Sequence, residues 1–283
     1  MPGKTVLITG TSTGIGLQTA LAAARANWQV IATMRNISKA GALEEAAVAA
    51  GVAERIEVRK LDVTDPASVR ECLEAVVAEH GTLHALINNA GSGHVGTLET
   101  DGVEAARRVM EVNFFGVLNT TSAALPHLRA SGGRVLAVSS VGGIVGQPFN
   151  EAYCAAKFAV EGYLESLAPV AATVGVGVTL VEPGAVASEF VANVGIPDDR
   201  AALAERMGPY APAMDAYLTR TAGAFAAAQS AQDAAAVVVA ALDAEQPPLR
   251  VQTSDGARAF VAAKLADPDG AKVIGMTSTW VAS

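Results

Sequence analysis

Cysteine is scarce in this sequence, and the histidines do not form a recognisable set of metal ligands. Only Cys72 and Cys154 occur among 283 residues, and the four histidines show no ligand spacing. Two cysteines this far apart offer neither a disulfide framework nor the paired spacing of a zinc site. We therefore expect no structural metal and a reducing, cytoplasmic environment.

Long apolar runs are also lacking, although hydrophobic residues make up 51% of the chain. The longest uncharged stretch, about 166–181, contains Pro169, Gly175 and Gly177. It is shorter than the ~18–20 apolar residues that a membrane-spanning helix needs. The first residues, MPGKTVLITG, lack the charged and apolar regions of a signal peptide. We expect neither an integral membrane segment nor a signal peptide.

Basic residues are too few and too scattered to form a nucleic-acid-binding surface. The chain has 20 Lys and Arg against 28 Asp and Glu, which gives a net charge of −8. Binding to nucleic acid requires clustered contacts with phosphates. The composition therefore favours a protein that acts on small molecules.

Strand and helix patterns alternate along most of the chain. Strands are predicted at 4–9, 28–33, 55–61, 83–88, 133–140 and 176–181, with a last one in QPPLRV, and helices at 15–26, 40–50, 66–80, 101–129, 152–168 and 231–242. Runs such as VLIT, ALIN and VLAV are apolar throughout, which is typical of parallel strands buried on both faces. This order predicts a single α/β domain over 1–283, a doubly wound Rossmann-type parallel sheet of about seven strands that binds its ligand at the carboxyl ends of the strands.

Two segments depart from this rhythm. In 187–226, Pro197, Pro209 and Pro212 interrupt weak helical patterns. A long irregular insertion in a compact domain usually has a function, so we interpret this segment as a substrate lid. The final residues, 255–283, form a C-terminal extension to which the pattern assigns no element.

A glycine-rich turn follows the first strand. Gly10, Gly14 and Gly16 stand with Ser12 and Ile15 in TGTSTGIG. Glycines allow a tight turn and let the backbone approach a pyrophosphate at a helix N-terminus. The spacing G-x-x-x-G-x-G differs from the common G-x-G-x-x-G fingerprint, so the turn alone leaves a plain strand–helix connection open.

The end of the second strand indicates which cofactor binds. Many NAD sites have an acid here that binds the ribose 2′-hydroxyl, whereas this chain has Thr33, Met34 and Arg35. A guanidinium suits a 2′-phosphate because its donors are fixed and bidentate. Ser12 would add a hydroxyl contact. We therefore expect NADP(H), with a solvated charge at the strand end as the alternative for Arg35.

Four polar residues form a candidate catalytic set. Tyr153 and Lys157 are four residues apart at the start of a helix and so lie on one face. A phenol has a pKa of about 10, which a neighbouring ammonium lowers. Ser140 ends the preceding strand, where its hydroxyl would bind a substrate oxygen. Asn113 lies among apolar neighbours, and a water-linked proton path to Lys157 would account for it.

These motifs together resemble the short-chain dehydrogenases/reductases over residues 4–190. The motifs that carry the resemblance are the 9–16 glycine turn, Asp62-Val63, Asn88-Asn89-Ala90-Gly91, Asn113, Ser140, Tyr153, Lys157 and Pro183-Gly184. The resemblance implies that Tyr153 is the general acid/base and that Ser140 orients the carbonyl. Lys157 would hold the nicotinamide ribose and lower the tyrosine pKa, and Asn113 would fix a water of the proton relay.

The resemblance also implies a set of cofactor-binding residues: Asp62 and Val63 at the adenine, Asn89, Ala90 and Gly91 along the cofactor, and Pro183, Gly184, Val186 and Ser188 at the nicotinamide amide. Two positions differ mildly from the family. Ser188 stands where the family usually has threonine, and Asn27 replaces the glycine before the second strand. Asparagine is the next best residue for a left-handed helix end.

Residues 139–168 and the tail stretch PPLRVQTSDG are similar to the branch that contains 17β-hydroxysteroid dehydrogenase type 1 and related retinol dehydrogenases. Arg220 replaces that branch's histidine, and its glutamate is missing near 277–279. Arg220 would pair with Asp215 or Asp198, or else meet a substrate carboxylate.

We expect the substrate to be a bulky apolar ketone or aldehyde, because the predicted pocket wall 141–150 is apolar. Further apolar lid residues are Phe190, Val191, Val194, Ile196, Tyr210, Met214, Tyr217 and Phe225.

The sequence therefore predicts an NADP(H)-dependent oxidoreductase that interconverts a carbonyl and a secondary alcohol on a steroid-, retinoid- or long-chain-like substrate. The alternatives are a non-catalytic NADP(H) sensor and a reductase of keto-acyl compounds. A sugar-nucleotide epimerase would need a different glycine turn and a larger C-terminal domain.

We also expect a homodimer or homotetramer packed through a four-helix bundle, unless the apolar positions of the helices predicted at 101–129 and 152–168 all face their own sheet. The positions are Val109, Val112, Phe115, Leu118, Phe158, Gly162, Leu164 and Leu167.

Overall fold

Seven parallel strands form the central sheet, in the order β3-β2-β1-β4-β5-β6-β9. The computed structural model describes residues 3–189, 194, 196–197 and 199–282. The strands are β1 (Thr5–Thr9), β2 (Gln29–Met34), β3 (Ile56–Lys60), β4 (Ala85–Asn88), β5 (Arg134–Val138), β6 (Gly177–Glu182) and β9 (Arg250–Gln252). β1 and β4 are buried at every residue because helices cover both of their faces. The predicted doubly wound parallel sheet is confirmed.

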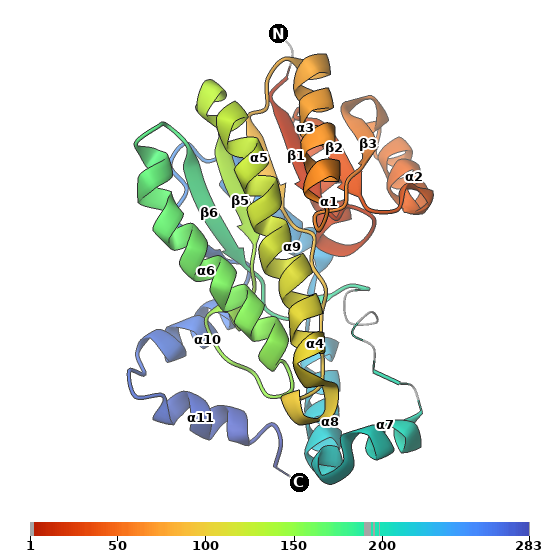
Figure 1. Cartoon of the computed structure of the whole chain (residues 1–283), viewed down its shortest axis with the longest axis vertical. Coiled ribbons are helices and arrows are strands. Elements are labelled where there is room, and N and C mark those ends of the chain that lie inside the picture. The colour runs from red at the N-terminus through yellow and green to blue at the C-terminus, as the bar shows by residue number, and fades with distance from the viewer. Residues whose placement is uncertain (1–2, 190–193, 195, 198, 283) are drawn as a thin grey trace.

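Helices cover both faces of this sheet (Figure 1). One layer packs on a core formed with α1 (Gly14–Arg25), α2 (Gly41–Ala49) and α9 (Ala231–Asp243). The other layer contains α3 (Pro66–His80), α5 (Gly116–Ser131) and α6 (Glu151–Ala172). Short 3-10 turns are η1 (Ile37–Lys39), η2 (Ala53–Arg55), η4 (Val141–Gly143) and η5 (Gly208–Tyr210).

The strand order reverses between β1 and β4, the two central neighbours. Crossovers leave these strands in opposite directions, so a crevice opens beyond their carboxyl ends. The glycine turn after β1 and the loops after β4, β5 and β6 meet at this end. Two helix ends have the residue types that such ends favour. The Asp65 side chain caps α3 by accepting from Ala67 N at 2.9 Å, and Asn27 ends α1 with a left-handed φ of 68°.

The helix predicted at 101–129 is longer than predicted and is interrupted by a π-helical turn. α4 (Leu98–Met110) leads into a π-helical turn, η3 (Glu111–Phe115), and then into α5. Gly102 has a φ of 69° and breaks the helical geometry near the start. The sequence pattern missed the π turn because one extra residue in a turn barely changes the spacing of apolar side chains. Asn113 lies inside this turn.

The predicted lid and the C-terminal extension contain more helix than expected. Within 187–226 are α7 (Arg200–Met207) and α8 (Ala211–Ala226). A two-stranded sheet of β7 (Val186–Ala187) and β8 (Gln229–Ser230) closes the base of this segment. The extension forms α10 (Asp255–Leu265) and α11 (Ala271–Ser278).

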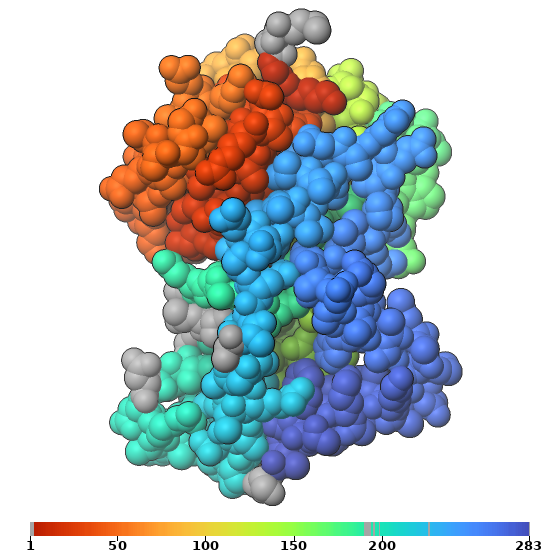
Figure 2. Space-filling view, turned by 180° about the vertical axis from the view of Figure 1, so that it is seen from behind, coloured from red at the N-terminus to blue at the C-terminus, as the bar shows by residue number. Residues whose placement is uncertain are grey.

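Figure 2 shows α8 and the end of the extension side by side, at the end of the molecule away from the N-terminus. The guanidinium of Arg220 lies 4.6 Å from the centre of the Trp280 ring, which joins the two segments. The division of 1–283 into one domain with a lid and an extension stays a prediction. None of the helices formed by the described residues is long and apolar enough to span a bilayer.

Candidate active site

A large pocket of about 1010 Å³ opens at the carboxyl ends of the strands. The glycine turn, the strand-end loops, α8 and the C-terminal extension all contribute to its lining. Every predicted catalytic and cofactor-binding residue lines this pocket except Asn113. The structure therefore brings together residues that lie as far apart in the sequence as Gly10 and Ser188.

The glycine turn has the shape of a phosphate cradle. Gly10 has a φ of 71°, and a Cβ there would lie 2.7 Å from the Cα of Ala90. A Cβ at Gly16 would collide with the carbonyl oxygen of Gly10. No side chain caps the start of α1 at Thr13, and the first turn contains no acid. The backbone N–H groups there suit a pyrophosphate, so these residues fit a dinucleotide cofactor.

Asn89 braces this cradle as well as lining the pocket. Its side-chain amide donates to the carbonyl oxygens of Thr9 and Gly10, at 2.9 Å each. The Thr9 hydroxyl accepts from the backbone N–H groups of Asn89 and Ala90, at 3.0 Å each. The loop after β4 thus holds the turn after β1, which the sequence pattern did not reveal.

The far end of the pocket, near β2 and β3, carries positive charge. Arg35 and Lys39 are exposed and line it, and Asp62 is the one carboxylate among the described lining residues. Asp62 Oδ1 accepts from the backbone N–H of Thr64 at 3.0 Å and from its hydroxyl at 2.8 Å. The predicted adenine contact of Asp62 stays a prediction.

Ser140, Tyr153 and Lys157 meet in the middle of the pocket. Lys157 Nζ donates to the carbonyl oxygen of Val138 at 2.9 Å and lies 5.8 Å from the centre of the Tyr153 ring. The Ser140 hydroxyl accepts from Gly142 N at 3.0 Å and shares a hydrogen bond with Tyr153. A substrate oxygen placed between Ser140 and Tyr153 would therefore meet two hydroxyl groups.

Burial dominates the titration of this pair. It raises the pKa of Tyr153 to about 12, and the hydrogen bond with Ser140 lowers it. Burial lowers the pKa of Lys157 to about 8, against the charge of Glu161, which raises it. We expected Lys157 to lower the tyrosine pKa. In this structure desolvation of the phenolate outweighs any such effect.

Asn113 lies behind the pocket wall, fully buried in the π turn. Its amide nitrogen donates to the carbonyl oxygens of Ser92 at 2.9 Å and Val109 at 3.0 Å, and its oxygen accepts from Ser92 N at 3.2 Å. A Cβ on Gly91 would lie 2.8 Å from the Asn113 oxygen. Asn113 therefore fixes the loop after β4. The water path to Lys157 stays a prediction.

The substrate half of the pocket, beyond Ser140 and Tyr153, is partly as predicted. Its lining residues are Val141, Gln147, Asn150, Tyr217, Arg220, Thr221, Ala224, Phe225, Ala257, Phe260 and Trp280. Met214 and Tyr210 were predicted to face the substrate. Instead, Met214 packs in a separate cluster with Leu203 and Met207, and the Tyr210 hydroxyl donates to Glu99 at 2.6 Å. Phe190 and Val191 lie outside the described residues.

Phe260 and Trp280 were missed by the sequence analysis. Their rings stack at 5.9 Å between centres, and both line the pocket. A signal was present, because only 5% of the chain is aromatic and two of these residues occur in the tail.

The predicted Arg220–Asp215 pair is wrong. Asp215 pairs with Arg200 at 2.8 Å, whereas Arg220 stacks on Trp280. Asp198, the other expected partner of Arg220, lies outside the described residues.

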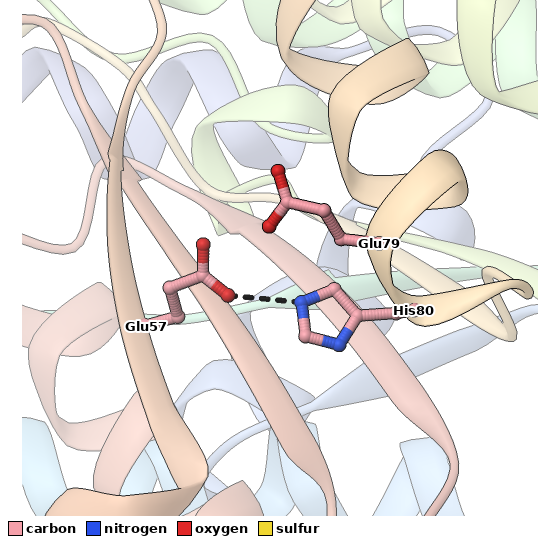
Figure 3. A group of neighbouring side chains, drawn as sticks. All are labelled: Glu57, Glu79 and His80. Carbon is pink, nitrogen blue, oxygen red and sulfur yellow. Dashed lines mark hydrogen bonds and ion pairs between the residues drawn. The ribbon is translucent and has the colours of Figure 1, made fainter.

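One further cluster of potential metal ligands lies on β3 and α3 (Figure 3), where Glu57, Glu79 and His80 come together among the described residues. His80 Nε2 lies 2.9 Å from Glu57 Oε2. Arg59 pairs with both glutamates, so a cation already occupies their shared space. None of these residues lines the pocket, and we interpret the cluster as a surface ion-pair network.

The comparisons with known proteins agree with one another on the family. Residues 4–198 match the family model described as short chain dehydrogenase. Retinol dehydrogenase 8 of Bos taurus is 39% identical over 94% of this chain and 86% of its own length. The 17-beta-hydroxysteroid dehydrogenase type 1 of Homo sapiens is 38% identical over 97% of this chain and 84% of its own. A short-chain dehydrogenase from Streptomyces avermitilis has a similar structure, with a TM-score of 0.76, 31% identity, and coverage of 98% of this chain and 96% of the other.

Proposed function

The chain belongs to the short-chain dehydrogenase family, and from that premise we propose that it is an NADP(H)-dependent oxidoreductase for a lipophilic carbonyl or secondary alcohol. One observation carries the proposal. A single pocket runs from the glycine cradle past Ser140, Tyr153 and Lys157 to an apolar end formed by Phe225, Phe260 and Trp280. A dinucleotide and a bulky substrate would therefore meet at the tyrosine.

When bound along the glycine cradle, NADPH would supply the hydride that reduces the carbonyl carbon. Ser140 and Tyr153 bind the carbonyl oxygen, and the Tyr153 hydroxyl donates its proton to that oxygen as negative charge develops there. Burial raises the pKa of this phenol to about 12, so the hydroxyl retains a proton that it can donate to a carbonyl oxygen at neutral pH. Lys157 sits beside the phenol, stabilises the phenolate left behind and binds the nicotinamide ribose.

The proposed preference for NADP(H) depends on Arg35 and Lys39. Both line the end of the pocket near β2, where no carboxylate follows the strand to bind a ribose 2′-hydroxyl. A guanidinium offers paired donors to a 2′-phosphate. The remaining predicted residues, from Gly10 to Ser188, are proposed to bind the cofactor as described above, and Asn113 to support the proton path.

A substrate of steroid or retinoid type fits both the apolar end of the pocket and the names of the relatives. The test is NADPH oxidation, followed by absorbance, with purified protein and a panel of ketones and aldehydes of increasing size, each also run with NADH. Lipophilic ketones should give the highest kcat/KM. Better turnover of small polar carbonyls would refute the lipophilic substrate. Tight NADPH binding with no turnover across the panel would favour the sensor alternative.

Arg220 supports a second candidate substrate, a lipophilic keto acid or keto-acyl compound. It is the one cation among the described residues of the substrate half, and its guanidinium lies over the Trp280 ring, 4.6 Å from the ring centre. In this arrangement the edge donors are available to a carboxylate. Arg220→Met retains the apolar stem and removes the charge. A selective loss of kcat/KM for keto acids, with neutral ketones unchanged, would identify that class.

We also propose a homodimer and a cytoplasmic location. Phe115, the last residue of η3, and Phe158 on α6 are 45% and 42% exposed, and apolar residues exposed in this way suit an interface between two copies of the chain. Val109 and Leu164, which we had assigned to that interface, are buried within the chain and do not belong to it. Light scattering at micromolar concentration tests the dimer, and a monomer would refute it.

A further inference from the structure

A cluster of buried acids lies directly behind the catalytic lysine. Glu161 follows Lys157 by one helical turn on α6, and Glu182 is the last residue of β6. They are 3% and 0% exposed, respectively. Arg250 of β9 reaches both, with its Nε 3.0 Å from Glu161 Oε2 and 3.3 Å from Glu182 Oε1. Buried carboxylates are costly unless they are paired, so this arrangement calls for an explanation.

The charges in this cluster do not balance if both acids are ionised. Among the residues that the structure describes, Arg250 is the one cation that pairs with them, and its Nη2 also pairs with the exposed Glu165 at 2.7 Å. Gln252 donates to Glu182 Oε2 at 2.8 Å, which satisfies that oxygen without adding charge. The pKa of Glu161 is raised to about 7, because burial and the charge of Glu182, which raise it, outweigh Ser139 and Arg250, which lower it. Two acids that share one cation in this way hold one proton between them near neutral pH.

Lys157 is the group that this charge acts on. Lys157 is 5% exposed, and Val138 supplies a neutral carbonyl to its ammonium rather than a counter-charge. Burial favours the neutral amine, and Glu161 is the acid that opposes it. The groups that face Glu161 are Lys157 and Glu165 on its own helix, Ser139 after β5, Glu182 on β6 and Arg250 on β9.

We infer that Glu161 is a positioning residue that keeps Lys157 protonated, and that Glu182 controls the charge of Glu161 by competing for a shared proton. The inference rests on the proposed function, because it assigns Lys157 a role in turnover. Glu161 touches neither the pocket nor a substrate; it acts through Lys157.

The signs of the expected effects follow from the charges. Activity requires the ammonium, so kcat/KM falls at high pH as Lys157 loses its proton. Glu161→Gln removes the negative charge, the lysine pKa falls, and the basic limb of the profile moves to lower pH by about one unit. Glu182→Gln removes the competing acid, so Glu161 ionises at lower pH. That variant should leave the basic limb in place or move it to higher pH.

Glu165→Gln is the matched control. Glu165 lies on the same helix and pairs with the same arginine, but its side chain is 57% exposed, so water screens its charge from Lys157. Its profile should match that of the wild type. A structural role for the cluster would lower activity at all pH values in both buried variants and would not give shifts of different sign.

A second measurement separates this inference from the proposed function. In protein labelled with 13C at the lysine Cε, the Lys157 signal is assigned by its loss in Lys157→Met and is then titrated with pH. The lysine pKa should be lower in Glu161→Gln than in the wild type, whether or not a substrate is turned over. An unchanged Lys157 titration in a folded Glu161→Gln variant would overturn the inference. If that variant fails to fold, a basic limb moved to lower pH in Glu182→Gln would overturn it instead.

Discussion

Replacing Tyr153 with phenylalanine tests the core of the proposed chemistry, because it removes one oxygen atom from the middle of the pocket. The fold should tolerate the change. The lost hydrogen bond is the one with Ser140, which is worth about 1 kcal/mol of net stability. The ring keeps its place at the start of α6. The glycine cradle and Arg35 are untouched, so the Kd for NADPH should stay within about threefold of the wild type, which corresponds to less than ~1 kcal/mol.

Turnover should fall far more than cofactor binding. Loss of general acid catalysis alone costs ~10²–10⁴-fold, which corresponds to roughly 3–5 kcal/mol of transition-state stabilisation. Ser140 still binds the carbonyl oxygen in the variant, so the loss should appear mainly in kcat. NADPH oxidation with the best ketone of the panel gives kcat and KM, and calorimetric titration gives the cofactor Kd.

Tyr163→Phe is the control for this experiment. Tyr163 lies on the same helix, is 42% exposed and is absent from the pocket lining. It loses the same atom and should show unchanged kinetics. A Tyr153→Phe variant with a kcat within about tenfold of the wild type would refute the assignment of Tyr153 as the proton donor.

Three further substitutions test other parts of the molecule. Arg35→Asp should raise the Kd for NADPH at least ~10-fold and improve the relative use of NADH, because a carboxylate repels a 2′-phosphate. Arg25 is an exposed arginine at the end of α1, outside the pocket, so the control variant Arg25→Asp should change neither value. Gly16→Ala should weaken NADPH binding by at least ~10-fold, because the new Cβ collides with the Gly10 carbonyl. Gly162→Ala, where a Cβ meets nothing within 4 Å, should bind NADPH normally. Equal NADPH affinities in the two variants would contradict the assignment of the glycine turn as a phosphate cradle. Trp28→Phe loses the hydrogen bond from Trp28 Nε1 to Asp243 Oδ1 at 2.8 Å and should lower the free energy of unfolding in urea by about 2 kcal/mol. A change below about 0.5 kcal/mol would show that this contact does not stabilise the packing of α9 against the residue that precedes β2.

Local patterns accounted for much of this protein. Apolar runs and helical spacing predicted the order in which strands and helices follow one another along the chain, because strands buried on both faces have no polar positions. Asp65 and Asn27 also behave as their residue types suggest, as a helix cap and a left-handed helix end. The proposed catalytic set of Ser140, Tyr153 and Lys157 was recognisable because the proposed reaction demands fixed residue types at fixed distances from a strand end or along one helix turn.

The features that the sequence did not reveal depend on contacts between distant segments. Phe260 and Trp280 reach the pocket only because the C-terminal extension folds back beside α8, and that packing also gives Arg220 a ring to stack on in place of the expected carboxylate. The pKa of Tyr153 is raised because burial, which no local pattern measures, outweighs its neighbours.

The sequence by itself determined the fold class, the turn that suits a dinucleotide and the residues of the proposed chemistry, since each depends on residues close together in the chain. Only the tertiary structure decided which segments line the substrate half and where the buried charge lies. Glu161, Glu182 and Arg250 come from three separate elements, and the electrostatic energy of such a cluster depends on distances and desolvation that exist only once the chain has folded.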